Sequence, residues 1–296
     1  MFLCHAVEAF IIEQQIRGNT NVTVCNYRRF LGYFMDYIGN DTPLSEITLN
    51  SLKSYYLSLS RKNLSSVTVQ TYIRAVRVFF SWCWQEEYMQ DNLSEKFRLP
   101  KARKNAVDVL TDSEIQRLLK SFDTSTFIGL RNICIVMLML DSGLRLRETV
   151  FLKRGSIHIA EGYMIVLGKG NKERYVPIGL QTKKHLLRYM VMHSSLSGET
   201  PLFVKDTMTP LQISTVKQLF RKLKKRTGID RLHPHLLRHT FATRYLENGG
   251  DIYSLQMILG HTSLEMVKKY VHMIPSKTAV NFSMYSPLDN IKKKRQ

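Results

Sequence analysis

The stretch from Tyr163 to Gly179 reads YMIVLGKGNKERYVPIG and is the clearest sign of β-structure in the chain. Two short runs rich in Tyr, Ile and Val flank a centre that contains glycine and asparagine. This arrangement is typical of a β-hairpin, because glycine and asparagine tolerate the backbone angles of a tight reversal. The sequence therefore predicts a hairpin whose tip carries Lys169, Lys172 and Arg174. GKGNK lacks the spacing of a phosphate-cradling Walker loop, so no nucleotide is implied.

Helical patterns flank the hairpin on both sides. From 109 to 160 the chain reads as helical, with a buried helix around 131–141 that contains the apolar run ICIVMLML. This run is far too short to cross a bilayer, which needs about 20 residues. The helical pattern resumes after 180 and continues to about residue 273. We therefore expect a mainly α-helical fold with a small antiparallel β-sheet in its C-terminal part.

The first hundred residues read as a separate helical region. Apolar residues recur every three or four positions in 20–39 and again in 65–89, as on one face of a helix. We assign the aromatic residues of both segments to core packing. Arg74 and Arg77 lie on the other side of the second segment, where they could contact phosphate or simply face solvent.

A domain boundary is expected after Pro100. Thr111 and Glu114 have the spacing of a capping box, which announces a new helix. We therefore expect a helical domain at 1–99, a basic linker at 100–108 and a second domain at 109–296. The linker could lie along a nucleic-acid backbone, although a merely flexible linker can be equally cationic. Its candidate contacts are Lys101, Arg103 and Lys104.

The composition points to an anionic partner. The chain has 43 Lys and Arg against 24 Asp and Glu, a net charge of +19. A cationic surface attracts phosphates and releases their counterions, so nucleic acid is favoured over a membrane. The 4 cysteines are widely spaced and form no CxxC pair, which argues against a zinc site or a disulfide framework and fits a reducing cytoplasm. The first residues do not form a signal peptide.

Three further segments combine residues suited to attack on a phosphodiester: SGLRLRETV (142–150), HPHLLRHTFATRYL (233–246) and LGHTSLEMVKKYVHM (259–273). The second segment places a histidine and an arginine three residues apart, on one face of a helix. The candidate reactive residues of the three segments are Arg145, His235, Arg238, His261 and Tyr270.

Together with Lys169, these residues form a set for phosphoryl transfer without a metal. A tyrosine hydroxyl attacks if a neighbour takes its proton or cations favour the phenolate. Arginines can clamp the phosphoryl oxygens, and a lysine can protonate the leaving oxygen. Helix geometry does not choose between Tyr270 and Tyr245, because Tyr245 shares a helical face with Arg238. The alternative for each residue is an ordinary packing or salt-bridge role.

The motifs GLRLRE, LGKGNKER, HPHLLRHTFAT and LGHTSLEMVKKYVH, in this order and spacing, resemble those of the tyrosine recombinases, or phage integrase family. The Xer-like and transposon-borne integrases look most similar. The resemblance covers nearly the whole chain and implies that Lys169 is the general acid and that Tyr270 forms a 3′-phosphotyrosyl bond. It implies a structural role for Glu148. The remaining residues that it implies to be catalytic are Arg145, His235, Arg238 and His261.

The resemblance also implies a site-specific DNA recombinase of two domains that clamp double-stranded DNA, without cofactor or metal. It implies a homotetramer on two DNA duplexes, an accessory protein that sets direction, and a cytoplasmic, nucleoid-associated protein of bacterial or phage origin. Integration, excision and resolution of DNA are all compatible with it. A type IB topoisomerase and a catalytically silent DNA-binding regulator are the alternatives. Lys172 and Arg174 join the linker residues, Arg74 and Arg77 as candidate DNA contacts.

Overall fold

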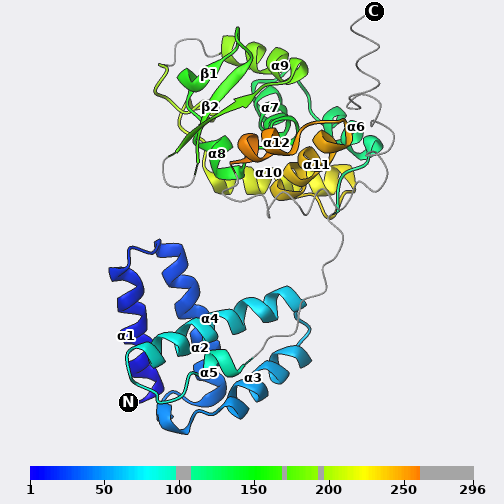
Figure 1. The fold of residues 1–296 in the computed structure, drawn as a ribbon. Helices are drawn as coiled ribbons and strands as arrows, with labels where there is room; N and C mark the ends of the chain where they lie inside the picture. The colour runs from blue at the N-terminus through cyan, green and yellow to red at the C-terminus, as the bar shows by residue number, and fades with distance from the viewer. Residues whose placement is uncertain (98–107, 169–171, 193–196, 261–296) are drawn as a thin grey trace, which may run out of the picture. The chain divides into compact units, whose positions relative to one another are not determined.

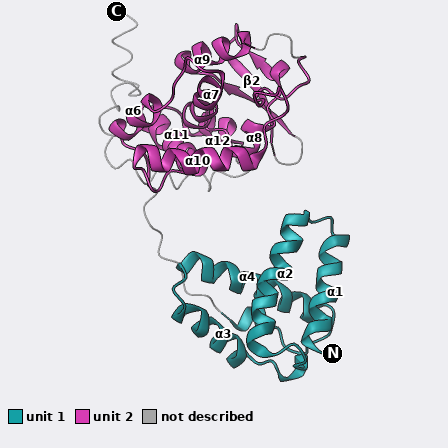
Figure 2. Ribbon diagram, turned by 180° about the vertical axis from the view of Figure 1, so that it is seen from behind, with its two compact units in different colours: residues 1–105 teal, residues 106–296 magenta. Residues whose placement is uncertain are grey.

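The computed structural model describes residues 1–97, 108–168, 172–192 and 197–260. The chain divides into two compact units, residues 1–105 and residues 106–296 (Figure 2). Most of the expected linker at 100–108 lies outside the described residues, so the domain boundaries given above stay predictions. No helix in the described parts is long and apolar enough to cross a membrane.

The first unit is helical in its described part. Its helix α4 contacts each of the other helices, and edge-to-face aromatic pairs such as Phe10–Phe79, with ring centroids 5.6 Å apart, fill the core around it. The helices expected within 20–39 and 65–89 are confirmed as α2 and α4. The elements are α1 (Leu3–Ile16), α2 (Asn21–Ile38), a 3-10 turn (Leu44–Glu46), α3 (Leu49–Arg61), α4 (Ser66–Gln85) and α5 (Leu93–Lys96).

The two arginines predicted on α4 differ in their surroundings. Arg74 is exposed. Arg77 is half-buried, and its Nε donates a hydrogen bond to the carbonyl oxygen of Ser94 at 2.9 Å. Arg77 therefore ties α4 to α5, a role that helical periodicity could not reveal.

The second unit is built around α7, which Figure 1 shows in its middle. Helix α7 contacts α8, α9 and α11, and it is apolar on nearly every side, so its neighbours bury it. This confirms the buried helix expected around 131–141. The helices are α6 (Asp112–Lys120), α7 (Phe127–Asp141), α8 (Leu146–Val150), α9 (Leu180–Val191), α10 (Ile213–Thr227), α11 (Pro234–Glu247) and α12 (Ile252–Leu259). The capping box of Thr111 and Glu114 is present at the start of α6.

The sheet has three antiparallel strands in the order β1-β2-β3: β1 (Ile157–His158), β2 (Tyr163–Leu167) and β3 (Glu173–Pro177). The hairpin prediction is confirmed by the pairing of β2 with β3, which runs from Tyr163 opposite Pro177 to Leu167 opposite Glu173. Arg174 is not at the tip, because it lies within β3 opposite Val166. A mainly α-helical fold with a small antiparallel sheet is therefore the observed fold class.

Helix was predicted wrongly in two places. After Val150 the chain forms a 3-10 turn (Arg154–Ser156) and then β1, instead of continuing as helix to residue 160. Between α9 and α10, the described residues include isolated bridges that join Lys153 to Pro201 and Val204 to Pro210. A two-residue strand and single bridges leave no periodic pattern, because the period-2 alternation of a strand needs about four residues to show.

Candidate functional site

The loop between α7 and α8 presents Arg145. Ser142 anchors this loop to β3, since its hydroxyl donates to the carbonyl oxygen of Pro177 at 2.9 Å. Gly143 follows with φ +66, and a Cβ there would lie 2.5 Å from the Phe241 ring, so only glycine fits. The loop thus packs closely against α11 before the chain reaches Arg145.

The acidic residue Glu148 of helix α8 contacts Arg145. Glu148 lies one turn into α8, and its Oε2 accepts a hydrogen bond from the backbone N–H of Arg145 at 2.8 Å. Its Oε1 accepts from Arg145 Nη1 at 2.7 Å. One carboxylate therefore caps the helix and orients the arginine side chain.

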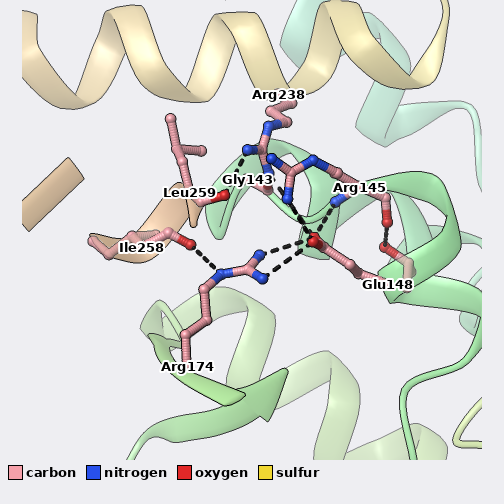
Figure 3. A network of polar contacts seen from close by, with 8 residues as sticks. Gly143, Arg145, Glu148, Arg174, Arg238, Ile258 and Leu259 are labelled. Carbon is pink, nitrogen blue, oxygen red and sulfur yellow. Dashed lines mark hydrogen bonds and ion pairs between the residues drawn. The ribbon is translucent and has the colours of Figure 1, made fainter. Parts of the chain in front are cut away.

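Two more arginines reach the same carboxylate from other elements (Figure 3). Arg174 of β3 donates from Nη1 to Glu148 Oε1 at 3.1 Å and from Nη2 to Oε2 at 2.8 Å. Arg238 of α11 places Nη1 3.9 Å from Oε2. Three guanidinium groups thus surround one carboxylate, and this arginine cluster (Arg145, Glu148, Arg174 and Arg238) keeps an excess of positive charge.

The four side chains of the arginine cluster differ in their access to solvent. The exposed fractions are 7% for Glu148, 10% for Arg174 and 5% for Arg238, against 32% for Arg145. Arg145 is therefore the member most able to contact a ligand directly. Glu148, Arg174 and Arg238 are largely buried beside it.

Glu148 stays ionised in this setting. Burial by itself would raise the pKa of its carboxyl, but the hydrogen bonds and charge of Arg174, followed by the bonds from Arg145, hold the pKa below its usual value. An ionised Glu148 accepts hydrogen bonds from both arginines and fixes their planes.

Arg238 also joins two distant segments. Its Nη1 donates to the carbonyl oxygen of Gly143 at 2.6 Å and its Nη2 to that of Leu259 at 2.7 Å. Arg238 therefore connects the loop that carries Arg145 with the C-terminal end of α12. The next residue but one after Leu259 is His261, so this contact lies close in sequence to a predicted catalytic residue.

The first turn of α11 carries the expected histidine. His235 is exposed, one turn before Arg238. His233 is the N-cap of α11, and its Nδ1 accepts a hydrogen bond from the backbone N–H of Leu236 at 2.9 Å. His233 thus has a helix-capping role. Among the described residues, no group of three or more His, Cys, Asp or Glu is placed to hold a metal ion.

A cleft of about 820 Å³ opens beside Arg145. Arg147 and Phe151 lie on its α8 side, and Leu167 and Gly168 line it at the end of β2. The guanidinium of Arg147 stands 5.8 Å from the centroid of the Phe151 ring. Gly168 is the residue before Lys169 in the sequence, and Lys169 itself lies outside the described residues. Arg147 was not among the predicted site residues, although its place two residues after Arg145 could have marked it.

Tyr245, the rival nucleophile, has a packing role. It is half-buried on α11, and its ring centroid is 5.7 Å from that of Phe241. A Cβ at Gly250 would lie 2.2 Å from the Tyr245 ring, so the chain after α11 turns closely over it. Two helical turns separate it from Arg238, about 10 Å along the helix axis.

The remaining predicted residues are placed as follows. Lys172 is exposed just before β3, and Arg174 is a member of the arginine cluster with a largely buried side chain. The predictions that fall outside the described residues are those for Lys101, Arg103, Lys104, Lys169, His261 and Tyr270.

Both units match known families. The model described as "Phage integrase family" matches residues 108–276, and that described as "Phage integrase SAM-like domain" matches residues 4–99. The chain is 32% identical to tyrosine recombinase XerC of Alcanivorax borkumensis, over 85% of this chain and 83% of the relative. The family match covers more than half of the chain, and the relative adds similarity across both units.

Solved structures share the fold. A Tn1549 transposon integrase in complex with a circular intermediate DNA aligns with a TM-score of 0.78 at 19% identity, over 91% of this chain and 94% of that chain. A lambda integrase tetramer bound to a Holliday junction aligns with a TM-score of 0.73 at 19% identity, over 89% and 78%. The chain therefore belongs to the phage integrase family and is a tyrosine recombinase.

Proposed function

We propose that the arginine cluster holds the scissile phosphate of a DNA strand while Tyr270 attacks it, so that the chain cleaves and rejoins DNA at specific sites. The observation that carries this proposal is the convergence of Arg145 and Arg238 on Glu148 beside an open cleft. The cluster has more positive than negative charge, and its most exposed member faces the cleft. A bound phosphate diester would supply the missing negative charge.

The chemistry follows from these positions. The Tyr270 oxygen, having lost its proton to a base, bonds to the phosphorus, and the bond from phosphorus to the 5′ oxygen breaks. Lys169 gives a proton to that 5′ oxygen, which leaves as a hydroxyl. The product is a 3′-phosphotyrosyl ester. Because the ester replaces one phosphodiester bond with another of similar energy, a 5′ hydroxyl can later attack it and restore the DNA strand.

The arginines act on the charge that develops during attack. As Tyr270 approaches, the phosphoryl oxygens become more negative, and fixed guanidinium groups stabilise them without reorganising. A single charge-stabilising arginine can contribute about 10³–10⁵ in rate. Arg145 and Arg238 are the residues to which we assign this role, and Glu148 keeps Arg145 in place.

We further propose that DNA binding spans both units. The net charge of +19 supports contact with the backbone at many points, and exposed Arg74 on α4 and Arg147 in the cleft are two such candidates. The lambda integrase neighbour is a tetramer on a Holliday junction, and we propose a homotetramer on two duplexes for this chain as well. An accessory protein and association with the nucleoid belong to the same proposal.

Covalent trapping tests the proposed function. The full chain is incubated in EDTA with a labelled, nicked duplex whose sequence the chain itself has selected from a randomised pool. The nick prevents rejoining, so a denaturant-resistant adduct accumulates. We expect Tyr270→Phe to abolish the adduct and the matched control Tyr245→Phe to retain it in any variant that folds. Tight, salt-sensitive binding without any adduct would refute the proposal and favour the silent DNA-binding regulator.

A further inference from the structure

We propose that Arg174 is a positioning residue that holds both Arg145 and the C-terminal end of α12, and that it does not contact DNA. The inference rests on the proposed function, because it assigns to Arg174 the task of arranging the phosphate-binding groups. Sequence position alone suggested the opposite, a basic residue near a hairpin tip. Three sets of contacts in the described residues argue for positioning.

The first contact is with Glu148. Arg174 binds both carboxylate oxygens through Nη1 and Nη2, at 3.1 Å and 2.8 Å. Such a bidentate pair fixes the plane of the carboxylate. Since Arg145 Nη1 donates to Oε1 of the same carboxylate at 2.7 Å, the orientation of the Arg145 guanidinium depends on Arg174.

The second contact is with the end of α12. The last carbonyl groups of a helix have no partner within the helix. Arg174 Nε donates to the carbonyl oxygen of Ile258 at 2.7 Å, and Arg238 Nη2 donates to that of Leu259 at 2.7 Å. Two arginines from two different elements therefore hold successive carbonyls at the point where α12 ends (Figure 3).

The third contact is with Gly260. This residue ends α12 with φ +62, and a Cβ there would lie 3.1 Å from Arg174 Cδ and 3.2 Å from its Nε. The backbone that leaves α12 therefore rests against the Arg174 side chain. His261 is the next residue in the sequence, so the contact fixes where the chain starts toward two predicted catalytic residues, His261 and Tyr270.

These contacts occupy all three guanidinium nitrogens of Arg174, which favours a positioning role over a DNA contact. The Arg174 side chain is 10% exposed, and its Nε, Nη1 and Nη2 each donate a hydrogen bond within the unit. A lysine could not replace it, because one ammonium group cannot reach a carboxylate and a carbonyl with three coplanar donors. Without Arg174, the basic side chains left on Glu148 among the described residues would be Arg145 and Arg238, and the positive charge offered to a phosphate would fall.

The kinetic test compares Arg174→Gln and Arg174→Lys with a charge control, Lys184→Gln, which changes an exposed residue of α9. Single-turnover adduct formation is measured on the nicked duplex described above. We expect both Arg174 variants to cleave about 10²-fold more slowly, as for a small misplacement of reacting groups, and Lys184→Gln to cleave normally. Adding Glu148→Gln to Arg174→Gln should cause little further loss, since both changes break the same unit. A double variant whose loss of cleavage rate equals the product of the two single losses would overturn the inference.

Salt dependence separates positioning from phosphate contact. A lost phosphate contact lowers the slope of log affinity against log salt by about 1. We expect this lower slope for Arg147→Gln, which alters the cleft. For Arg174→Lys and Arg174→Gln we expect the slope to change no more than it does for Lys184→Gln. A slope for Arg174→Gln that matches Arg147→Gln would overturn the inference and restore Arg174 as a DNA contact.

Hydrogen exchange on the free protein tests whether Arg174 holds the C-terminal end of α12, and it does not rely on catalysis. It also reports whether each variant is folded. We expect faster exchange in peptides that cover Ile252 to Gly260 for both Arg174 variants, with α7 unchanged, and no effect of Lys184→Gln. Unchanged exchange at the end of α12 would overturn the inference. A wild-type chain that forms no adduct refutes the proposed function instead, and the exchange result still decides whether Arg174 holds α12.

Discussion

Glu148→Gln removes the one carboxylate among three guanidinium groups, and its cost can be worked from the structure. The side chain is 7% exposed and lies within 3.1 Å of donors from Arg145 and Arg174 and 3.9 Å from Arg238. A unit-charge pair 4 Å apart is worth about 4 kcal/mol at an effective dielectric constant of 20. Glutamine would also turn an N–H donor toward one of the arginines.

A lower desolvation cost opposes this loss, because a neutral glutamine is easier to bury than a carboxylate. The pKa of Glu148 decides which effect is larger. Burial raises this pKa, yet the hydrogen bonds and charge of Arg174 and the hydrogen bonds from Arg145 lower it overall, so the attractive interactions outweigh the burial penalty. We therefore expect Glu148→Gln to destabilise the second unit by about 3–5 kcal/mol, the usual cost of breaking a buried ion pair from one side.

The assay is thermal and urea unfolding of the full chain at pH 7, followed at the transition of the second unit. A loss of this size corresponds to a drop in Tm of roughly 6–20 °C for a unit of this length. A depressed carboxyl pKa contributes stability above the unfolded pKa that is lost as pH falls through the folded pKa. The difference in unfolding free energy between wild type and Glu148→Gln should therefore become smaller in acid. A variant as stable as wild type at pH 7, with a normal fold, would refute the reasoning.

Two further predictions concern other contacts of the second unit. Arg238→Lys keeps the charge but loses the paired hydrogen bonds to the carbonyl oxygens of Gly143 and Leu259. The rate of adduct formation should therefore fall by about 10³-fold or more while DNA affinity changes little. A fall in rate of less than tenfold would contradict this prediction. The hydrogen bond from Arg231, the hydrogen bonds from Thr111 and the charge of Arg231 together lower the pKa of Glu114 to about 2. The stability that the ionised Glu114 carboxylate contributes should therefore disappear as pH falls from 4.5 toward 2. Urea midpoints of Glu114→Gln should then depend less on pH than those of wild type in this window, and equal slopes would contradict the assignment.

Local patterns in the sequence determined much of the fold. The apolar run within α7, the capping box of Thr111 and Glu114, and the β-hairpin were all predictable, because each follows from residues within a few positions of one another. The motifs around Arg145 and Arg238 were recognisable for the same reason. Where local signals were too short, as in the two-residue strand β1, the prediction failed.

Only the tertiary structure decided what the charged side chains bind. Arg174 follows Glu148 by 26 positions and Arg238 follows Gly143 by 95, so no local pattern could reveal that they meet. Helix geometry left Tyr245 as a rival to Tyr270 until the family resemblance favoured Tyr270, and only the structure shows that Tyr245 packs against Phe241 and Gly250. The physical reason is that helix and strand formation depend on neighbours along the chain. The partner of an arginine, and hence its role, depends on which surfaces the folded core brings together.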